Sequence, residues 1–257
     1  LQVKRPYEPN AADIEILKDT THFRVFDIVD GTTRASYFHN ALSGYHAAKL
    51  RRYDELFDFH IARNNMNVLN MLNTKYIIAE EEGEIFAFNN YETNGNAWFI
   101  ERLERKRSAD EEIRALDSLN TKQTAVFSEN QTDPEYPELV SKLKSSYVRD
   151  SLASIRLTSY APDHLIYATD NINDGFAVFS EIYYSHGWQA YIDDEPVPHL
   201  RVNYVLRGMP VPAGSHQIVF KFEPKVIQRG SNIALMSSIL FGIVLIGGCF
   251  FAFKPRK

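Results

Sequence analysis

The apolar and polar positions along the chain follow three patterns in succession. In residues 1–131, stretches with helical spacing alternate with short apolar runs that favour strands. In residues 148–224 the period becomes two, as in the segment HQIVFKFEP. Residues 232–253 contain no Asp, Glu, Lys, Arg or His. We therefore predict an α+β N-terminal region, an antiparallel β-sandwich and one C-terminal transmembrane helix.

The first region is expected to contain short helices and strands. Gly83 allows a hairpin, and Ser108 is a suitable N-cap whose capping box Glu111 completes. The predicted elements are, in order, a helix in ADIEILKD, a strand at 23–28, a mostly helical stretch in LRRYDELFDFHIARNNMNVLNMLN, strands in KYIIA, EIFAFNN and NAWFIERLE, a helix in SADEEIRALDSL and a strand in QTAVFSE.

The two soluble regions are expected to be joined by a linker. The stretch ENQTDPEYPELVSK contains two prolines and several acids, so we place the linker at 132–147, with a few helical residues possible at its end. The sandwich strands that follow are separated by turn residues and are expected in SIRLTSY, HLIYATD, FAVFSEIYY, WQAYID, VNYVLRG and HQIVFKFEP.

The apolar segment 232–253 is long enough to cross a membrane, since a helix of this length measures roughly 33 Å. A buried helix of a soluble domain is less favoured because such helices have a polar face. Three basic residues follow the segment and two precede it, which weakly favours a cytoplasmic C-terminus and an external domain.

An external domain requires an export signal, and the chain begins LQVKRPYEPN without a Met or an apolar stretch. We therefore expect that earlier membrane helices of the same protein are missing here. Ala234, Ser238 and Gly242 recur every four residues, a spacing that lets membrane helices approach closely. Upstream transmembrane helices and the bilayer are thus the expected partners.

Composition and motifs exclude several functions. A net charge of −5 and the lack of a long basic run do not favour nucleic-acid binding, and the single cysteine, Cys249, lies in the apolar segment. The common nucleotide, hydrolase and metalloprotease motifs are missing, and the eight histidines are scattered. The run Asp193-Asp194-Glu195 is best interpreted as a solvated turn, so no metal, cofactor or catalytic residue is predicted.

A basic and aromatic segment is the first candidate site. Lys49, Arg51 and Arg52 precede Tyr53, and guanidinium groups pair well with phosphate oxygens. The segment could therefore contact a phosphate, a pyrophosphate or an anionic lipid headgroup. The alternative is a helix start with a solvated basic face.

An aromatic segment is the second candidate. In EIYYSHGWQAYIDD, the rings of Tyr184, Trp188 and Tyr191, with Tyr183 beside them, could stack on a sugar. Alternating aromatic residues in a sandwich also pack in the core or at its rim.

The segment YYSHGWQAYIDDEPVPHLRVNYVLRGMPVPAGSHQIVFKFEP, followed by an apolar helix, resembles the C-terminal end of the YfhO family of bacterial membrane proteins. NALSGYHAAKLRRYDEL and NVLNMLNTKYII resemble the extracytoplasmic domain of the same family, so the resemblance extends from about Phe23 to the end. The family resembles GT-C glycosyltransferases, whose catalytic acid lies in an early loop without a counterpart here.

The resemblance implies an extracytoplasmic domain of a multi-pass protein in the bacterial cytoplasmic membrane. Such a domain would be an accessory part that positions an acceptor for sugars carried on polyprenyl phosphate. A membrane-anchored glycan-binding module and a structural domain without catalysis are the alternatives. The residues present do not decide whether the protein is an enzyme.

Overall fold

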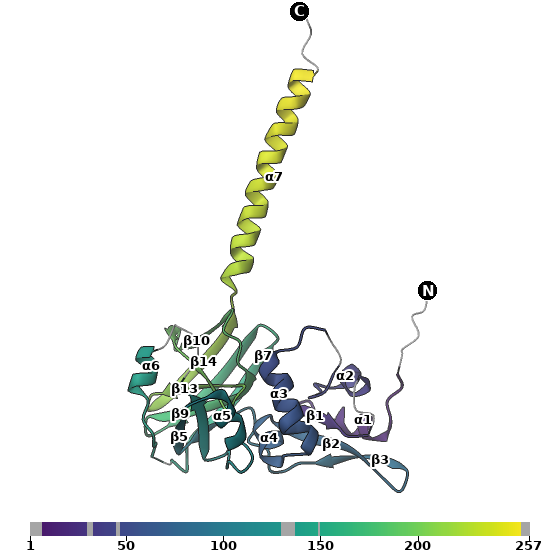
Figure 1. Ribbon diagram of the computed structural model, residues 1–257, viewed down its shortest axis with the longest axis vertical. Coiled ribbons are helices and arrows are strands. Elements are labelled where there is room, and N and C mark those ends of the chain that lie inside the picture. The colour runs from purple at the N-terminus through teal and green to yellow at the C-terminus, as the bar shows by residue number, and fades with distance from the viewer. Residues whose placement is uncertain (1–6, 30–32, 45–46, 130–136, 149, 253–257) are drawn as a thin grey trace, which may run out of the picture.

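The computed structural model describes residues 7–29, 33–44, 47–129, 137–148 and 150–252 (Figure 1). The first elements surround a three-stranded sheet of order β1-β2-β3, in which β1 and β2 are parallel and β2 and β3 antiparallel. These elements are α1 (Ala11–Ile16), β1 (Arg24–Asp27), α2 (Arg34–Phe38), α3 (Arg51–Phe59), the 3-10 helix η1 (Ile61–Arg63), α4 (Met66–Met71), β2 (Thr74–Glu81) and β3 (Glu84–Asn89).

The predicted hairpin at Gly83 is confirmed. Glu82 and Gly83 connect β2 to β3 with φ angles of 52° and 84°. Two successive positive φ angles are what a tight hairpin turn with the right twist requires, and glycine adopts them without strain.

The predicted strand in NAWFIERLE divides into two at Glu101. β4 (Ala97–Ile100) pairs with β9 (Gly175–Ile182) of the sandwich, whereas β5 (Arg102–Lys106) pairs in parallel with β6 (Thr124–Ser128). The N–H groups of Glu101 and Arg102 both donate to Gln123 O, which turns the chain from one sheet to the other. Between β5 and β6 lies α5 (Ala109–Ala115), where Ser108 caps the helix as predicted.

The sandwich consists of two antiparallel sheets. One has the order β11-β10-β14-β8-β7 and the other β12-β13-β9-β4. Aromatic side chains such as Tyr167, Phe179 and Phe220 fill the space between them. The strands are β7 (Ser154–Ala161), β8 (His164–Asn171), β9 (Gly175–Ile182), β10 (Trp188–Ile192), β11 (Glu195–Val197), β12 (Leu200–Val202), β13 (Leu206–Val211) and β14 (Gly214–Phe222).

The four-stranded sheet contains strands from both regions expected from the sequence. β4 precedes the stretch assigned to the linker, whereas β9, β12 and β13 follow it. Part of that stretch, 132–136, lies outside the described residues. The rest contains α6 (Pro137–Lys142), and Leu139, Val140 and Tyr147 pack against the larger apolar core. The described part of the linker is therefore attached to the domain surface.

A single long helix leaves the domain (Figure 1). α7 (Lys225–Ala252) follows β14 after only Glu223 and Pro224, and Arg229–Cys249 is apolar and long enough to cross a membrane. None of that span is buried against the rest of the protein. The predicted fold class is thus confirmed: helices and a small sheet, then antiparallel sheets, then one apolar helix.

Candidate functional site

The direction of β14 defines two ends of the sandwich. β14 runs toward α7, and its last residue, Phe222, pairs with Trp188 at the start of β10. We call this the helix-proximal end, and the opposite end, where β14 starts at Gly214 beside Asn171, the helix-distal end. The start of α3 lies near the height of the helix-proximal end in Figure 1.

Two of the predicted cations are exposed at the start of α3. Lys49 Nζ lies 2.9 Å from Asp54 Oδ1, and Arg51 Nε donates to Glu55 Oε1 at 2.9 Å. The side chain of Lys49 is 48% exposed and that of Arg51 90% exposed. Because exposed ion pairs contribute little free energy, both cations can exchange their present partners for a ligand anion.

Arg52 and Tyr53 have structural contacts instead. Arg52 donates to Glu112 at 3.2 Å, and its guanidinium carbon lies 4.4 Å from the centre of the Tyr204 ring. The Tyr53 hydroxyl donates to Leu42 O at 2.7 Å, and burial raises the pKa of Tyr53 to about 12. The structure therefore separates the predicted set into two exposed cations and two residues held inside the fold.

Glu112 was not predicted from the sequence. Its carboxylate is fully buried and accepts a hydrogen bond from Tyr204 N at 2.9 Å, and burial raises its pKa. The Tyr204 hydroxyl in turn donates to Glu55. Glu55 was recognisable as a partner of Arg51 because it follows four residues later on one helix face. Glu112 is 60 residues from Arg52, and no local pattern connects them.

The three predicted sugar-stacking rings do not form one surface. Trp188 points toward the apolar core, where the guanidinium carbon of Arg207 lies 4.0 Å from the Trp188 ring centre. Tyr191 is three positions further along β10, so it lies on the opposite face of the sheet. Tyr184 is exposed in the loop before β10, 6.4 Å from the Phe222 ring.

Small-ligand sites typically occupy clefts of roughly 300–1,000 Å³. A cleft of about 700 Å³ lies at the helix-proximal end. Tyr191, Gln189, Asp163 and Glu223 line it, and Ile227 of α7 forms part of its wall. The Tyr191 hydroxyl donates a hydrogen bond to Glu223 Oε2 at 3.1 Å. Burial, and to a smaller extent this hydrogen bond, raises the pKa of Tyr191. The cleft combines the Tyr191 and Phe222 rings with amide and carboxylate acceptors.

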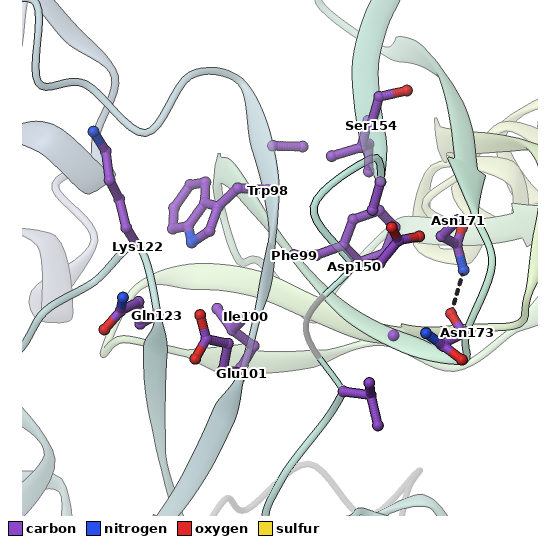
Figure 2. A pocket seen from close by; sticks show the side chains of 15 residues that line it. Trp98, Phe99, Ile100, Glu101, Lys122, Gln123, Asp150, Ser154, Asn171 and Asn173 are labelled. Atoms are coloured by element: carbon purple, nitrogen blue, oxygen red, sulfur yellow. Dashed lines mark hydrogen bonds between the residues drawn. The ribbon is translucent and has the colours of Figure 1, made fainter.

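A second cleft, of 460 Å³, lies at the helix-distal end (Figure 2). Phe99, Asp150, Asn171 and Asn173 are among the side chains that line it. Neither the basic segment nor the aromatic segment predicted from the sequence contributes to this second cleft.

The described residues contain no group of three or more His, Cys, Asp or Glu side chains placed to hold a metal ion. The run Asp193-Asp194-Glu195 forms the turn between β10 and β11, with φ angles of 50° and 68° at its two aspartates. Asp193 accepts hydrogen bonds from Gln217 N and His216, which accounts for its conformation.

Residues 114–234 match the family model described as bacterial membrane protein YfhO. Over this segment the chain is similar to the YfhO family. No curated protein and no solved structure matches the chain.

The segment matched to YfhO begins in α5 and ends within α7, so it contains every strand of the sandwich except β4. Tyr184, Trp188 and Tyr191 lie within it, whereas Lys49 and Arg51 lie before it. The match to a family of membrane proteins and the apolar helix together support a membrane location for this protein.

Proposed function

We propose that this domain is the extracytoplasmic accessory part of a multi-pass, glycosyltransferase-like protein of the bacterial cytoplasmic membrane. It positions an acceptor next to a sugar carried on polyprenyl phosphate. The observation that carries the proposal is the helix-proximal cleft, which has a residue of the membrane helix, Ile227, in its wall.

The connection to α7 keeps this cleft close to the bilayer. Only Glu223 and Pro224 separate β14 from α7, and the apolar span begins at Arg229. The four helical residues before Arg229 extend about 6 Å. A sugar attached to a membrane lipid would therefore reach the cleft without leaving the headgroup region.

The charges of the cleft favour a neutral sugar over a phosphate. Asp163 and Glu223 supply carboxylates that accept hydrogen bonds from hydroxyl groups, and Tyr191 supplies a ring on which a sugar can stack. Carboxylates repel phosphate oxygens. The exposed cations Lys49 and Arg51 are the better partners for a phosphate or a lipid headgroup, while Arg52 and Tyr53 hold their segment in place.

The cleft is tested in the complete gene product reconstituted in liposomes, by measuring sugar transfer from a polyprenyl-phosphate donor. Tyr191→Ala and Glu223→Gln are expected to raise the KM for the acceptor about tenfold, the loss of roughly 1.4 kcal/mol of binding, with kcat unchanged. Tyr91→Ala removes a highly exposed ring outside the cleft and serves as the matched control. Equal KM values for all four proteins would contradict the acceptor role.

The cations are tested by binding to vesicles. A Lys49→Ser, Arg51→Ser double variant is expected to bind vesicles containing anionic lipid several-fold more weakly than the parent, with a reduced dependence on salt. Lys122→Ser, which removes an exposed lysine paired with Glu92, is the control. If the double variant binds as the parent does, the headgroup assignment is wrong.

The alternative is a membrane-anchored module that binds glycans without catalysis. The helix-distal cleft favours it, because that cleft lies at the end away from the membrane helix. A complete protein that binds glycans but transfers no sugar from any polyprenyl-phosphate donor would support this alternative.

A further inference from the structure

The helix-distal cleft is the open end of a seam between the two sheets. β4 and β7 are edge strands of different sheets and are not hydrogen-bonded to each other. At the helix-proximal end the seam is closed by His22, whose ring stacks on Tyr160 at 3.8 Å, and by the ion pair of Arg24 with Glu181. At the other end no comparable pair of described residues fills the seam, and a 460 Å³ cleft remains.

The rim of this cleft is held by side-chain hydrogen bonds. Asp150 accepts from Leu152 N at 2.9 Å and from Ile172 N at 2.8 Å, so it ties the loop before β7 to the turn after β8. Asn171 Nδ2 donates to Asn173 O at 2.7 Å (Figure 2) and to Pro212 O at 2.8 Å. The cleft is therefore preorganised, which lowers the entropic cost of binding a ligand.

One polar atom at this rim has no partner among the described residues. Asn171 is only 4% exposed, and its Oδ1 accepts no hydrogen bond. Most buried polar side-chain atoms in proteins have a partner, and those that lack one need an explanation. Because both hydrogens of Nδ2 are used, the orientation of the amide is fixed. A small shift of the rim would let Oδ1 accept a hydrogen bond from a ligand.

The lining contains planar polar side chains and a phenyl ring beside aliphatic residues. Gln123, Asn173, Glu101 and Asp150 supply amide and carboxylate groups, and Phe99 lies over Gly175. Among the described residues the lining includes one cation, Lys122, whose ammonium already pairs with Glu92 at 3.3 Å. An anionic ligand would meet two carboxylates, and an apolar ligand would leave the amides unsatisfied.

We infer that the helix-distal cleft binds a short segment of a neutral glycan. Sugar hydroxyls both donate and accept hydrogen bonds, so they match amides and carboxylates, and the apolar face of a sugar ring matches Phe99. This site is separate from the helix-proximal cleft and does not depend on it. A glycan chain bound here is held at the end of the domain remote from the bilayer.

The inference is tested on the full chain in detergent micelles with an array of neutral oligosaccharides, including maltotriose and chitotriose, and with inorganic phosphate. We expect millimolar or tighter binding of at least one neutral oligosaccharide and none of phosphate. Phe99→Ala and Asn173→Ala are each expected to weaken that binding at least tenfold. Asn173→Ala leaves the backbone carbonyl that accepts from Asn171, so it preserves the rim.

Gly175→Ala provides a variant that removes no polar group. An added Cβ would lie 2.7 Å from Phe99 Cδ1, so the ring must move and reshape the cleft. Loss of glycan binding in this folded variant supports the inference. The inference is overturned if the parent protein binds none of the neutral oligosaccharides. It is also overturned if Phe99→Ala, Asn173→Ala and Gly175→Ala all bind with the affinity of the parent. Binding lost only in Tyr191→Ala would place the sugar in the helix-proximal cleft and also overturn it.

Discussion

Two residues with unfavourable backbone angles are stabilised by side chains from distant elements. Asn203 and Tyr204 connect β12 to β13 with φ angles of 48° and 72°. Asparagine tolerates this region, but tyrosine seldom adopts it, at a cost of order 1 kcal/mol or more. Glu112 accepts from Tyr204 N, and Asn203 Oδ1 accepts from Val126 N, so the turn is held from α5 and β6.

Glu112→Ala is expected to lower the free energy of unfolding by about 2–3 kcal/mol, because Tyr204 N–H and Arg52 lose their acceptor. Urea denaturation of the full chain in micelles measures the change. Glu111→Ala alters the adjacent, exposed glutamate of the same helix and is expected to cost less than about 1 kcal/mol. Equal losses for the two variants would show that Glu112 has no special role.

His216 should make stability depend on pH. Its Nδ1 lies 2.6 Å from Asp193 Oδ2 and its Nε2 lies 3.2 Å from Ala213 O. The hydrogen bond to Asp193 raises the pKa of His216 above 6.5. The folded state binds the proton more tightly than the unfolded state, so the protonated His216–Asp193 pair adds to the free energy of unfolding. This added stability is fully present below about pH 6.5 and is lost as pH rises through the folded pKa.

An NMR titration of the imidazole checks this directly, with Asp193→Asn as the comparison. The pKa of His216 should return toward its ordinary value in Asp193→Asn. In the parent protein the urea midpoint should fall as pH rises above 6.5, and in His216→Gln this fall should disappear. A pKa of His216 at or below 6.5 in the parent protein would refute the pairing.

At the scale of elements, period-two patterns predicted the sandwich strands well, but two predicted strands, one from each soluble region, are broken at points that the pattern did not predict. The run VNYVLRG alternates as one strand would, yet it contains the Asn203–Tyr204 turn. NAWFIERLE divides because its two halves pair with different strands, β9 and β6. Pairing partners distant in sequence leave no local signal, so these breaks could not be predicted from the pattern.

The mostly helical stretch predicted before β2 is also interrupted. Asn64 and Asn73 have φ angles of 57° and 54° and lie directly after η1 and shortly after α4. Asparagine is a common residue in this conformation where helices end. Those two asparagines were a readable signal, whereas the helical spacing of the apolar residues across them was misleading.

The N-cap of α5 is predicted to contribute measurably to stability. Ser108 Oγ accepts from Glu111 N at 3.2 Å, but Glu111 Oε2 accepts from Arg107 N rather than from Ser108 N. The cap is thus one half of a capping box. Ser108→Ala is expected to cost about 1 kcal/mol in urea denaturation. Ser118→Ala, at an exposed serine just after the helix, should change stability by less than about 0.5 kcal/mol; a comparable loss there would contradict the cap.

At the scale of the whole molecule, the candidate sites depend on contacts that the sequence alone does not display. The chemistry of the exposed cations and of Tyr191 was readable from residue types. The sequence did not show that Arg52 and Trp188 have structural contacts instead, because their partners Glu112 and Arg207 come from distant elements. The helix-distal cleft has no sequence motif, since β4, β7 and the turn after β8 meet there only in the folded protein.

The orientation of the domain decides which side of the membrane both clefts occupy. In a Cys249→Ser background, Tyr91→Cys places a thiol at a position 84% exposed between β3 and β4. A membrane-impermeant maleimide should label it in intact spheroplasts, whereas Lys257→Cys should be labelled only after lysis, as the basic residues after the apolar segment predict. The reverse pattern would place the domain in the cytoplasm, where it could not position an acceptor outside the cell. The proposed function would then fail, whereas glycan binding by the helix-distal cleft could still be measured.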